Sequence, residues 1–321
     1  MNGGIVILDV IAFGETMAAF TPLSQGPLRY VPDYRMRTAG SESNLAIGLA
    51  KLGHSAGFIS RLGEDEFGHY ILNFIRGEGV DVSRVIMDDA HPTGVMFKQT
   101  SSIETSVFYY RAHSAASYYS AAALDEGYIE SARMLYLTGI TPLLSPSCLQ
   151  ACSRIVTIAG SAGIPIVFDP NIRMRLWGKG EKKQEILALL MQANIVLMGM
   201  DEARLLLNTD DIACISDMLF GKGHATHIAL KDGARGAHIL TPLQSIPIPP
   251  YPCQSIDSVG AGDAFNAGFL SGLLQGLDVG CCGEMGAICG ALATQTTGDI
   301  EGYPSKKQLD TLLGGGTTIY R

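Results

Sequence analysis

The residue types best suited to chemistry lie together in one run near the C-terminus, D-S-V-G-A-G-D-A-F-N-A-G-F, from Asp257 to Phe269. Gly260 and Gly262 allow backbone conformations that a Cβ excludes. The segment after them can begin a helix, whose first N–H groups lack internal partners and form an anion site with the positive end of the helix dipole. Asp263 would stand at the mouth of this site, where a carboxylate repels an anion unless it has a task.

The task that suits Asp263 is proton transfer, because a carboxylate beside an anion site can accept the proton of a hydroxyl group that attacks a phosphoryl group. The alternative is an ordinary strand-to-helix turn that Asp263 caps. The sequence has no G-x-x-x-x-G-K-[ST] run, no H-R-D motif and no complete G-x-G-x-x-G after its first expected strand, which disfavours a Rossmann dehydrogenase. Phosphate contact is therefore expected from residues 260–263.

Composition limits the classes of partner. The 321 residues are 47% hydrophobic, enough for a large core, and the net charge of −8 argues against a nucleic-acid or anionic-membrane partner. The seven cysteines show no C-x-x-C spacing, so reduced thiols are expected rather than zinc or disulfides. The first residues lack the basic start of a signal peptide, and no apolar run is long enough to span a membrane. A cytoplasmic protein is expected.

Strand-like and helical patterns alternate along most of the chain, which predicts an α/β fold with a mainly parallel sheet covered by helices on both faces. Strands are expected at 5–11, 56–60, 134–137, 164–169, 195–198 and 226–230, and helices at 43–52, 67–76, 146–159, 181–192, 201–207 and 212–220. Segments 13–37 and 93–111 break the alternation with β-type composition. They form either a small antiparallel sheet outside the main one or ordinary edge strands. No linker is visible, so residues 1–321 are expected to form one domain.

The run from Asp257 to Phe269 resembles the C-terminal signature of the ribokinase-like (pfkB-type) carbohydrate kinases. The resemblance implies that Asp263 is the catalytic base and that, in the turn beginning at Gly260, the backbone of Ala261, Gly262 and Asp263 holds phosphate. It implies a ribokinase-like fold in which a small β-sheet forms a lid over the sugar, often used for homo-oligomer formation. It also implies ATP and Mg²⁺ as cofactors, with a monovalent cation possible near the Asp257 loop.

Two further strings have counterparts in this family. K-D-G-A-R-G follows a strand and resembles the nucleotide-binding turn, which implies that Lys231, Gly233 and Gly236 contact ATP; alone, it reads as a hairpin turn. T-A-G-S-E-S-N resembles the family's G-G-x-x-x-N motif, with Ala39 replacing its first glycine. Gly40 and Asn44 would then hold sugar hydroxyls, whereas the alternative is a helix-capping segment.

A metal contact is implied at one position. The family's N-x-x-E motif corresponds to G-M-D-E at residues 199–202, so Gly199 replaces the asparagine and Glu202 is retained. Glu202 is expected to organise water around Mg²⁺. The alternative is a solvated acid favoured by the helix dipole in the first turn of a helix.

The substrate is indicated by two arginine-containing strings, F-Y-Y-R at 108–111 and D-P-N-I-R at 169–173. Guanidinium groups bind carboxylates in bidentate fashion. These strings, T-G-I-T at 138–141 and G-D-I-E-G at 298–302 look like those of 2-keto-3-deoxygluconate kinases. The resemblance assigns Tyr109, Arg111 and Arg173 to a sugar acid, although either arginine alone could form a surface ion pair. Met96 stands where some relatives carry tyrosine.

The implied reaction is ATP-dependent phosphorylation of the primary hydroxyl of a 2-keto-3-deoxy sugar acid. A fructokinase or another ketose kinase is the alternative within the family, and it would gain nothing from two arginines. A non-catalytic sugar-acid sensor on the same scaffold is the alternative from another class, and the presence of Asp263 argues against it.

Overall fold

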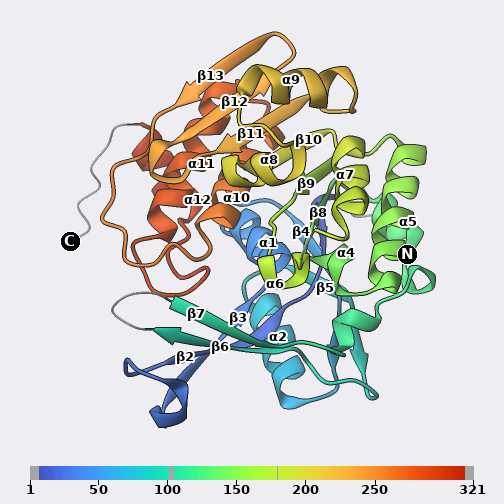
Figure 1. Ribbon diagram of the computed structural model, residues 1–321, viewed down its shortest axis with the longest axis vertical. Coiled ribbons are helices and arrows are strands. Elements are labelled where there is room, and N and C mark those ends of the chain that lie inside the picture. Colours follow the sequence, from blue (N-terminus) through green and yellow to red (C-terminus); the bar gives the residue numbers. More distant parts are fainter. Residues whose placement is uncertain (1–6, 101–104, 179, 315–321) are drawn as a thin grey trace, which may run out of the picture.

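The computed structural model describes residues 7–100, 105–178 and 180–314. Its main element is a nine-stranded sheet in the order β13-β12-β11-β10-β9-β8-β1-β4-β5 (Figure 1). Strands β5 through β11 in this order pair in parallel, and β12 and β13 pair antiparallel at one edge. The strands are β1 (Leu8–Phe13), β4 (Ala56–Gly63), β5 (Asp81–Asp88), β8 (Ala132–Thr138), β9 (Ile166–Asp169), β10 (Ile195–Gly199), β11 (His227–Lys231), β12 (Ala237–Thr241) and β13 (Gln244–Ile248).

Helices cover both faces of this sheet, because the central strands carry apolar side chains on both faces. In β1, Val10 and Ala12 join one hydrophobic cluster, whereas Ile11 and Phe13 join the other. The first cluster includes residues of α1 (Ser41–Lys51), α2 (Glu66–Gly77), α10 (Ala261–Leu274), α11 (Val279–Ala293) and α12 (Lys306–Leu313). The second includes residues of α3 (Glu126–Glu130), α4 (Thr141–Leu144), α5 (Pro146–Ala162), α6 (Met174–Trp177), α7 (Lys183–Gln192), α8 (Met200–Leu207) and α9 (Ile212–Gly221).

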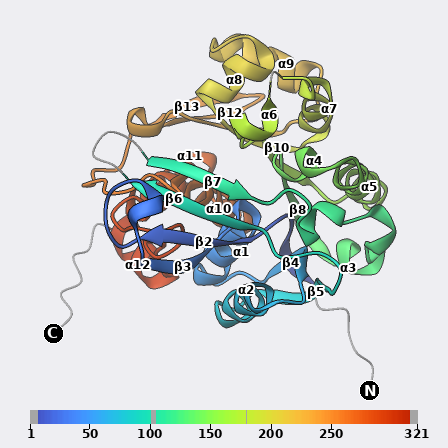
Figure 2. The same ribbon diagram turned by 60° about the horizontal axis from the view of Figure 1, so that its bottom comes forward.

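A separate four-stranded sheet, β3-β2-β6-β7, is formed by two segments distant in sequence. Its strands are β2 (Met17–Pro22), β3 (Tyr34–Ala39), β6 (Val95–Thr100) and β7 (Thr105–Tyr110). Figure 1 shows it below the large sheet, and Figure 2 shows it in front of α1 and α10. The expected small sheet is thus confirmed and the edge-strand alternative is wrong. One of its pairings, β2 with β6, is parallel rather than antiparallel.

The α/β expectation is confirmed, with differences in detail. The first strand ends at Phe13 rather than at residue 11, and the start of the expected range lies outside the described residues. The sequence patterns did not predict β5, the β12–β13 hairpin, α11 or α12. The hairpin was missed because a Pro interrupts β13, which tolerates it at the edge of the sheet. Within the described ranges, no helix is long and apolar enough to cross a membrane.

Helices α10 and α11 pack so closely that glycine is required where they meet. A Cβ at Gly268 would lie 2.5 Å from the carbonyl oxygen of Met285 and 2.8 Å from Sγ of Cys289. A Cβ at Gly272 would lie 2.8 Å from Sγ of Cys282. Backbone atoms cannot yield as a flexible side chain can, so this contact holds the start of α10 in place.

We therefore expect Gly268→Ala to lower the free energy of unfolding by about 1–3 kcal/mol through overpacking, although alanine favours helices. Gly160→Ala is the matched control, because nothing lies within 4 Å of the Cβ it would add on α5. That control should stabilise the protein by about 0.5–1 kcal/mol. Urea unfolding monitored by circular dichroism measures both changes, and equal stability of the two variants would contradict the close-packing explanation.

Candidate active site

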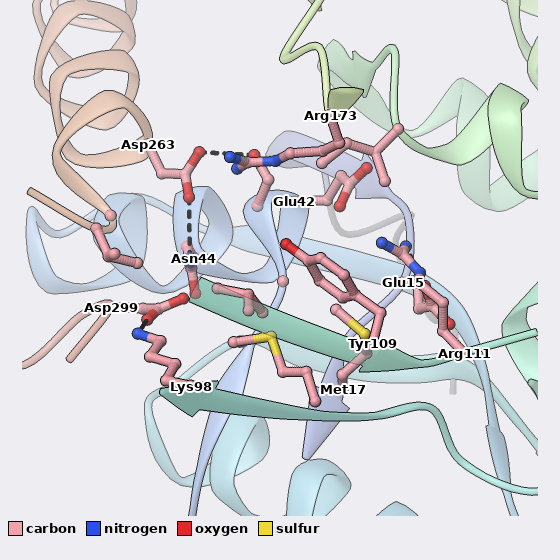
Figure 3. A pocket seen from close by; sticks show the side chains of 18 residues that line it. Glu15, Met17, Glu42, Asn44, Lys98, Tyr109, Arg111, Arg173, Asp263 and Asp299 are labelled. Carbon is pink, nitrogen blue, oxygen red and sulfur yellow. Dashed lines mark hydrogen bonds and ion pairs between the residues drawn. The ribbon is translucent and has the colours of Figure 1, made fainter. Parts of the chain in front are cut away.

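The carboxyl ends of β1 and β8, the beginnings of α1 and α10, and the small sheet surround a cavity of about 130 Å³. Side chains from all these parts line it (Figure 3). Met17, Met96, Val107 and Tyr109 come from the small sheet, and Asp263 comes from the first turn of α10. We call this space the sugar cavity below, after the ligand that the family resemblance implies.

Asp263 is buried at the base of the sugar cavity, with 6% of its surface exposed. Its Oδ1 accepts a hydrogen bond from Ser41 Oγ at 2.6 Å, and its Oδ2 accepts one from Asn44 Nδ2 at 2.9 Å. Burial raises the pKa of Asp263 to about 6, against the opposing effect of these two hydrogen bonds and of the positive charge of Arg173. A carboxylate in this state is suited to general-base catalysis near neutral pH.

The turn before Asp263 depends on glycine. Gly260 is the N-cap of α10 and has a φ of +79°, so Asp263 is not the capping residue and that alternative is wrong. A Cβ at Gly260 would also lie 2.0 Å from the carbonyl oxygen of Asp299. The N–H of Ala261 lies 3.3 Å from the Ser258 carbonyl. The helix start therefore points its dipole toward the sugar cavity and the space next to it.

A second cavity, of about 360 Å³, lies on the other side of the α10 start. Gly262 and Ala261 line it together with Lys231, Gly233 and Gly236. We call it the nucleotide cavity. Apolar groups form much of its remaining wall, including Pro250, Tyr251, Phe265, Ala287 and Ala291. Gly260, which we expected to contact the phosphates of the nucleotide, lines the sugar cavity instead.

The K-D-G-A-R-G segment is a hairpin turn that also lines this cavity. It connects the antiparallel strands β11 and β12, and the N–H of Asp232 donates to the carbonyl of Gly236 at 2.8 Å. Gly233 and Gly236 both have positive φ, +56° and +91°. A Cβ at Gly236 would lie 2.1 Å from the Ile248 carbonyl oxygen. The structural and ligand-binding interpretations of this turn are therefore compatible.

Lys231, in the wall of the nucleotide cavity, is held by a polar network that the sequence patterns did not reveal. Its Nζ contacts Asp169 Oδ2 at 2.7 Å and Asn266 Oδ1 at 3.1 Å. Asn266 Nδ2 donates to the same Asp169 oxygen at 2.6 Å and to Tyr136 Oη at 3.2 Å. Asp169 and Asn266 belong to sequence motifs that we selected for Arg173 and Asp263. No pattern in the sequence indicated that these two side chains contact Lys231.

The two arginines approach the sugar cavity from different sides. Arg173, from the loop after β9, reaches toward Asp263 in Figure 3 and has no ion-pair partner among the described residues. Arg111 instead pairs with the buried carboxylate of Glu15, whose Oε1 accepts from Ser114 Oγ at 2.6 Å. Its guanidinium also lies over the Tyr109 ring, 5.7 Å from the centroid. Arg111 is thus a positioned and partly neutralised cation.

Gly40 and Asn44 lie at the start of α1 beside Asp263. A Cβ at Gly40 would lie 2.4 Å from the Glu15 carbonyl oxygen, so this close approach requires glycine. Asn44 Oδ1 is buried and has no hydrogen-bond partner among the described atoms, which leaves it free to accept from a ligand hydroxyl. Gly40 is the N-cap of α1, so the segment also has the capping role that we considered.

Lys98 and Asp299 form a buried ion pair in the opposite wall of the sugar cavity, with Nζ 3.0 Å from Oδ1. The sequence patterns did not single out Lys98. Lys98 is a lysine in a segment of β-type composition, and such a side chain usually faces solvent, so nothing in the sequence indicated that it is buried. The pair joins β6 of the small sheet to the loop that touches Gly260.

Glu202 is half-buried at the start of α8 and holds two backbone segments. Its Oε2 accepts from the N–H of Gly199 at 2.8 Å, and its Oε1 accepts from the N–H of Ile172 at 2.7 Å. Burial and the nearby Asp169 raise its pKa. No group of three or more potential metal-ligating side chains occurs in the described ranges. The water-mediated magnesium role of Glu202 stays a prediction.

Comparison with known proteins identifies the family of this chain. Residues 8–306 match the family model described as pfkB family carbohydrate kinase. The chain belongs to this family. This kinase is 36% identical over 322 residues to the 2-dehydro-3-deoxygluconokinase of Bacillus subtilis (strain 168), with 98% of each protein covered. It is 32% identical over 312 residues to the enzyme of the same name from Thermoproteus tenax, covering 96% of this chain and 94% of that protein.

A solved structure confirms the fold. The crystal structure of a PfkB protein from Polaromonas sp. JS666 is 37% identical to this kinase and has a TM-score of 0.87, covering 94% of this chain and 99% of that one. The resemblance to ribokinase-like carbohydrate kinases and the expected kinase class are therefore confirmed.

The raised pKa of Asp263 predicts how the turnover of this kinase depends on pH. Because a general base must be deprotonated, turnover of this kinase should fall as the pH drops below about 6. The hydrogen bond from Ser41 stabilises the carboxylate, so Ser41→Ala should raise the pKa and shift the acidic limb of the kcat profile to higher pH. Ser153→Ala, on the exposed side of α5, is the control and should leave the profile unchanged. An acidic limb that stays in place in Ser41→Ala would contradict this description.

Proposed function

We propose that this kinase transfers the γ-phosphoryl group of ATP to the primary hydroxyl of a 2-keto-3-deoxy sugar acid. The observation that carries the proposal is the position of the α10 start between two cavities. Asp263 lines the sugar cavity, and Gly262, one residue earlier, lines the nucleotide cavity. A hydroxyl group and a phosphoryl group bound on either side of this turn would meet at Asp263.

The chain's own groups can perform each part of this transfer. Asp263 accepts the hydroxyl proton, while Ser41 and Asn44 hold its carboxylate in place. The dipole of α10 and the ammonium group of Lys231 stabilise negative charge that develops on the transferred group. The apolar wall of the nucleotide cavity suits a purine ring, and its glycine turn allows close approach of phosphates.

Magnesium fits this site as an ion that is bound mainly by the phosphates of the nucleotide. Mg²⁺ usually binds substrate phosphates with few protein ligands, and it would neutralise charge on the phosphate oxygens. Both oxygens of Glu202 already accept backbone hydrogen bonds, so we assign it at most a contact through water. A monovalent cation near Asp257 stays a prediction; the Oδ1 of Asp257 accepts from the N–H of Val259 at 3.1 Å.

An acidic substrate is favoured over a neutral ketose by the charges of the sugar cavity. Arg173 offers a guanidinium group without an ion-pair partner in the described chain, and Arg111 offers one that Glu15 orients. A carboxylate gains an ion pair and bidentate hydrogen bonds from such groups, whereas a neutral ketose gains hydrogen bonds without the ion pair. The names of the two bacterial and archaeal relatives support the same choice, because 2-dehydro-3-deoxygluconate is 2-keto-3-deoxygluconate.

The small sheet is proposed to act as a lid and as a contact between subunits. Its inner face carries Met17, Met96 and Tyr109 into the sugar cavity. Aromatic rings pack together on its other side, where Phe20 stacks on Phe97 at 5.0 Å and Tyr110 is 66% exposed. An exposed aromatic surface of this kind suits a homo-oligomer. A cytoplasmic location, where ATP is available, is the setting that the proposal requires.

Asp263→Asn should fold normally and lower kcat by about 10²–10⁴-fold, which is the usual contribution of a general base. An ADP-release assay with 2-keto-3-deoxygluconate measures the change, and circular dichroism confirms the fold. Turnover near that of the unaltered kinase would refute the role of Asp263. Absence of ADP release from the unaltered kinase with every sugar tested would instead favour the non-catalytic sensor.

Arg173→Ala should raise KM for 2-keto-3-deoxygluconate by about tenfold or more while leaving KM for ATP nearly unchanged, because it removes a charge-assisted hydrogen bond worth about 1.5–3 kcal/mol.

The same assay with fructose tests the ketose alternative. The unaltered kinase should have a higher kcat/KM for 2-keto-3-deoxygluconate than for fructose, and Arg173→Ala should reduce the ratio of these two values. Arg154→Ala, on the outer face of α5, is the matched control. A preference for fructose would replace the proposed substrate with a ketose.

A further inference from the structure

One buried acid lines the sugar cavity without a role in the transfer described above. Glu42 lies in the first turn of α1 with none of its surface exposed, two residues before Asn44. Figure 3 shows it in the upper wall of the cavity, between Arg173 and Glu15. A carboxyl group is costly to bury, so its presence here calls for a physical explanation.

The surrounding chain is shaped around this carboxyl group. Its Oε1 accepts from Thr138 Oγ1 at 2.5 Å and from Thr141 Oγ1 at 2.8 Å. A Cβ at Gly14 would lie 2.1 Å from the carboxyl carbon and 2.4 Å from Oε2, so glycine at this position makes room for the acid. Three positions on β8, α4 and the turn after β1 thus hold the group in one place.

The other carboxyl oxygen is left without a partner. Oε2 of Glu42 is buried and has no hydrogen bond to any described atom. Both oxygens of Asp263, by contrast, are hydrogen-bonded. Because Glu42 lines the cavity, its buried oxygen without a partner is a candidate for a hydrogen bond to the ligand.

The electrostatic surroundings favour a neutral Glu42. Burial and, to a smaller extent, the negative charge of Asp263 raise its pKa to about 7, against the opposing effect of the two threonine hydroxyls. The pKa values of the two other titratable groups coupled to Glu42, Tyr136 on β8 and Cys152 on α5, lie well above their usual values because of burial, so both groups stay neutral. The remaining charged groups that line the cavity near Glu42 are Glu15, Arg111 and Arg173.

We propose that Glu42 is a specificity residue, whose protonated Oε2 donates a hydrogen bond to an acceptor oxygen at the acid end of the substrate. The inference rests on the proposed function, because only an anionic sugar supplies the necessary charge. A carboxylate placed near Glu42 disfavours a second negative charge in the same buried space, so the carboxyl group binds a proton from solvent when the sugar acid binds. A neutral ketose has no such effect. No bond within the sugar changes in this step.

The test is calorimetric titration of the full chain with 2-keto-3-deoxygluconate, without ATP, in buffers that differ in ionisation enthalpy. At about pH 8, where Glu42 is largely ionised in the free protein, we expect binding to take up most of one proton, and affinity to fall up to tenfold per pH unit above this range. Glu42→Gln keeps a hydrogen-bond donor at the same place. It should bind with little proton uptake and with affinity that is independent of pH between about 7 and 9.

Two other variants separate the possible proton sites. Asp263→Asn should keep the proton uptake if Glu42 is responsible. Glu130→Gln, an exposed change of the same type at the end of α3, should behave like the unaltered protein. Thr141→Val removes one hydrogen bond to the carboxylate, so it should move the pH at which uptake appears upward, and it provides a second test if Glu42→Gln does not fold.

These experiments distinguish an error in the role of Glu42 from an error in the proposed substrate. Binding of 2-keto-3-deoxygluconate without proton uptake, or equal uptake in Glu42→Gln and the unaltered protein, would overturn the role of Glu42 and leave the kinase proposal standing. Absence of both binding and phosphorylation of 2-keto-3-deoxygluconate would overturn the substrate proposal and this inference with it.

Discussion

The structure depends on burying one carboxylate at the start of a helix. Asp263 can lie there only because Gly260 turns the chain with a positive φ and because Ser41 and Asn44 donate hydrogen bonds to both of its oxygens. These donors come from α1, more than 200 residues earlier in the chain. The packing of α1 and α11 against α10 is therefore what places Asp263, and the large sheet is the support that brings these helices together.

The local parts of the site could be predicted from sequence, and the long-range parts could not. The glycine turn before Asp263 and the K-D-G-A-R-G turn are contiguous strings, so their residue types indicate their conformation. The ion pair of Arg111 with Glu15 and the contacts of Lys231 with Asp169 and Asn266 join distant segments. No spacing rule in a single sequence links such partners, because they depend on strand order.

The same distinction applies to the fold. Alternating strands and helices indicated a parallel sheet, because each buried strand is apolar on both faces. The pairing of β2 with β6, about 75 residues apart, was not visible in either segment. The aromatic and β-branched residues of both segments allowed a small sheet, but only the fold shows that β2 and β6 are the strands that join the two hairpins.

Charge pairing in the sugar cavity explains how a pocket with four acids can receive an anion. Glu15 and Asp299 are each paired with a cation, and burial favours the neutral form of Glu42. Arg173 is left as the cation that no described carboxylate neutralises within ion-pair distance, and it lies toward Asp263 (Figure 3). The net charge of the whole chain, −8, thus says little about the cavity. Local pairing decides what it attracts.

The loop that carries Asp299 connects the two halves of the reaction. Its carbonyl oxygen fills the space where Gly260 lacks a side chain, and its carboxylate holds Lys98 of the small sheet. Arg37 of the same sheet holds Glu301, two residues further on, at 2.6 Å. Moving the sheet away would separate Lys98 from Asp299, and two unpaired buried ions are unfavourable until water reaches them. Opening of the small sheet as the lid proposed above would therefore be coupled to hydration of the cavity.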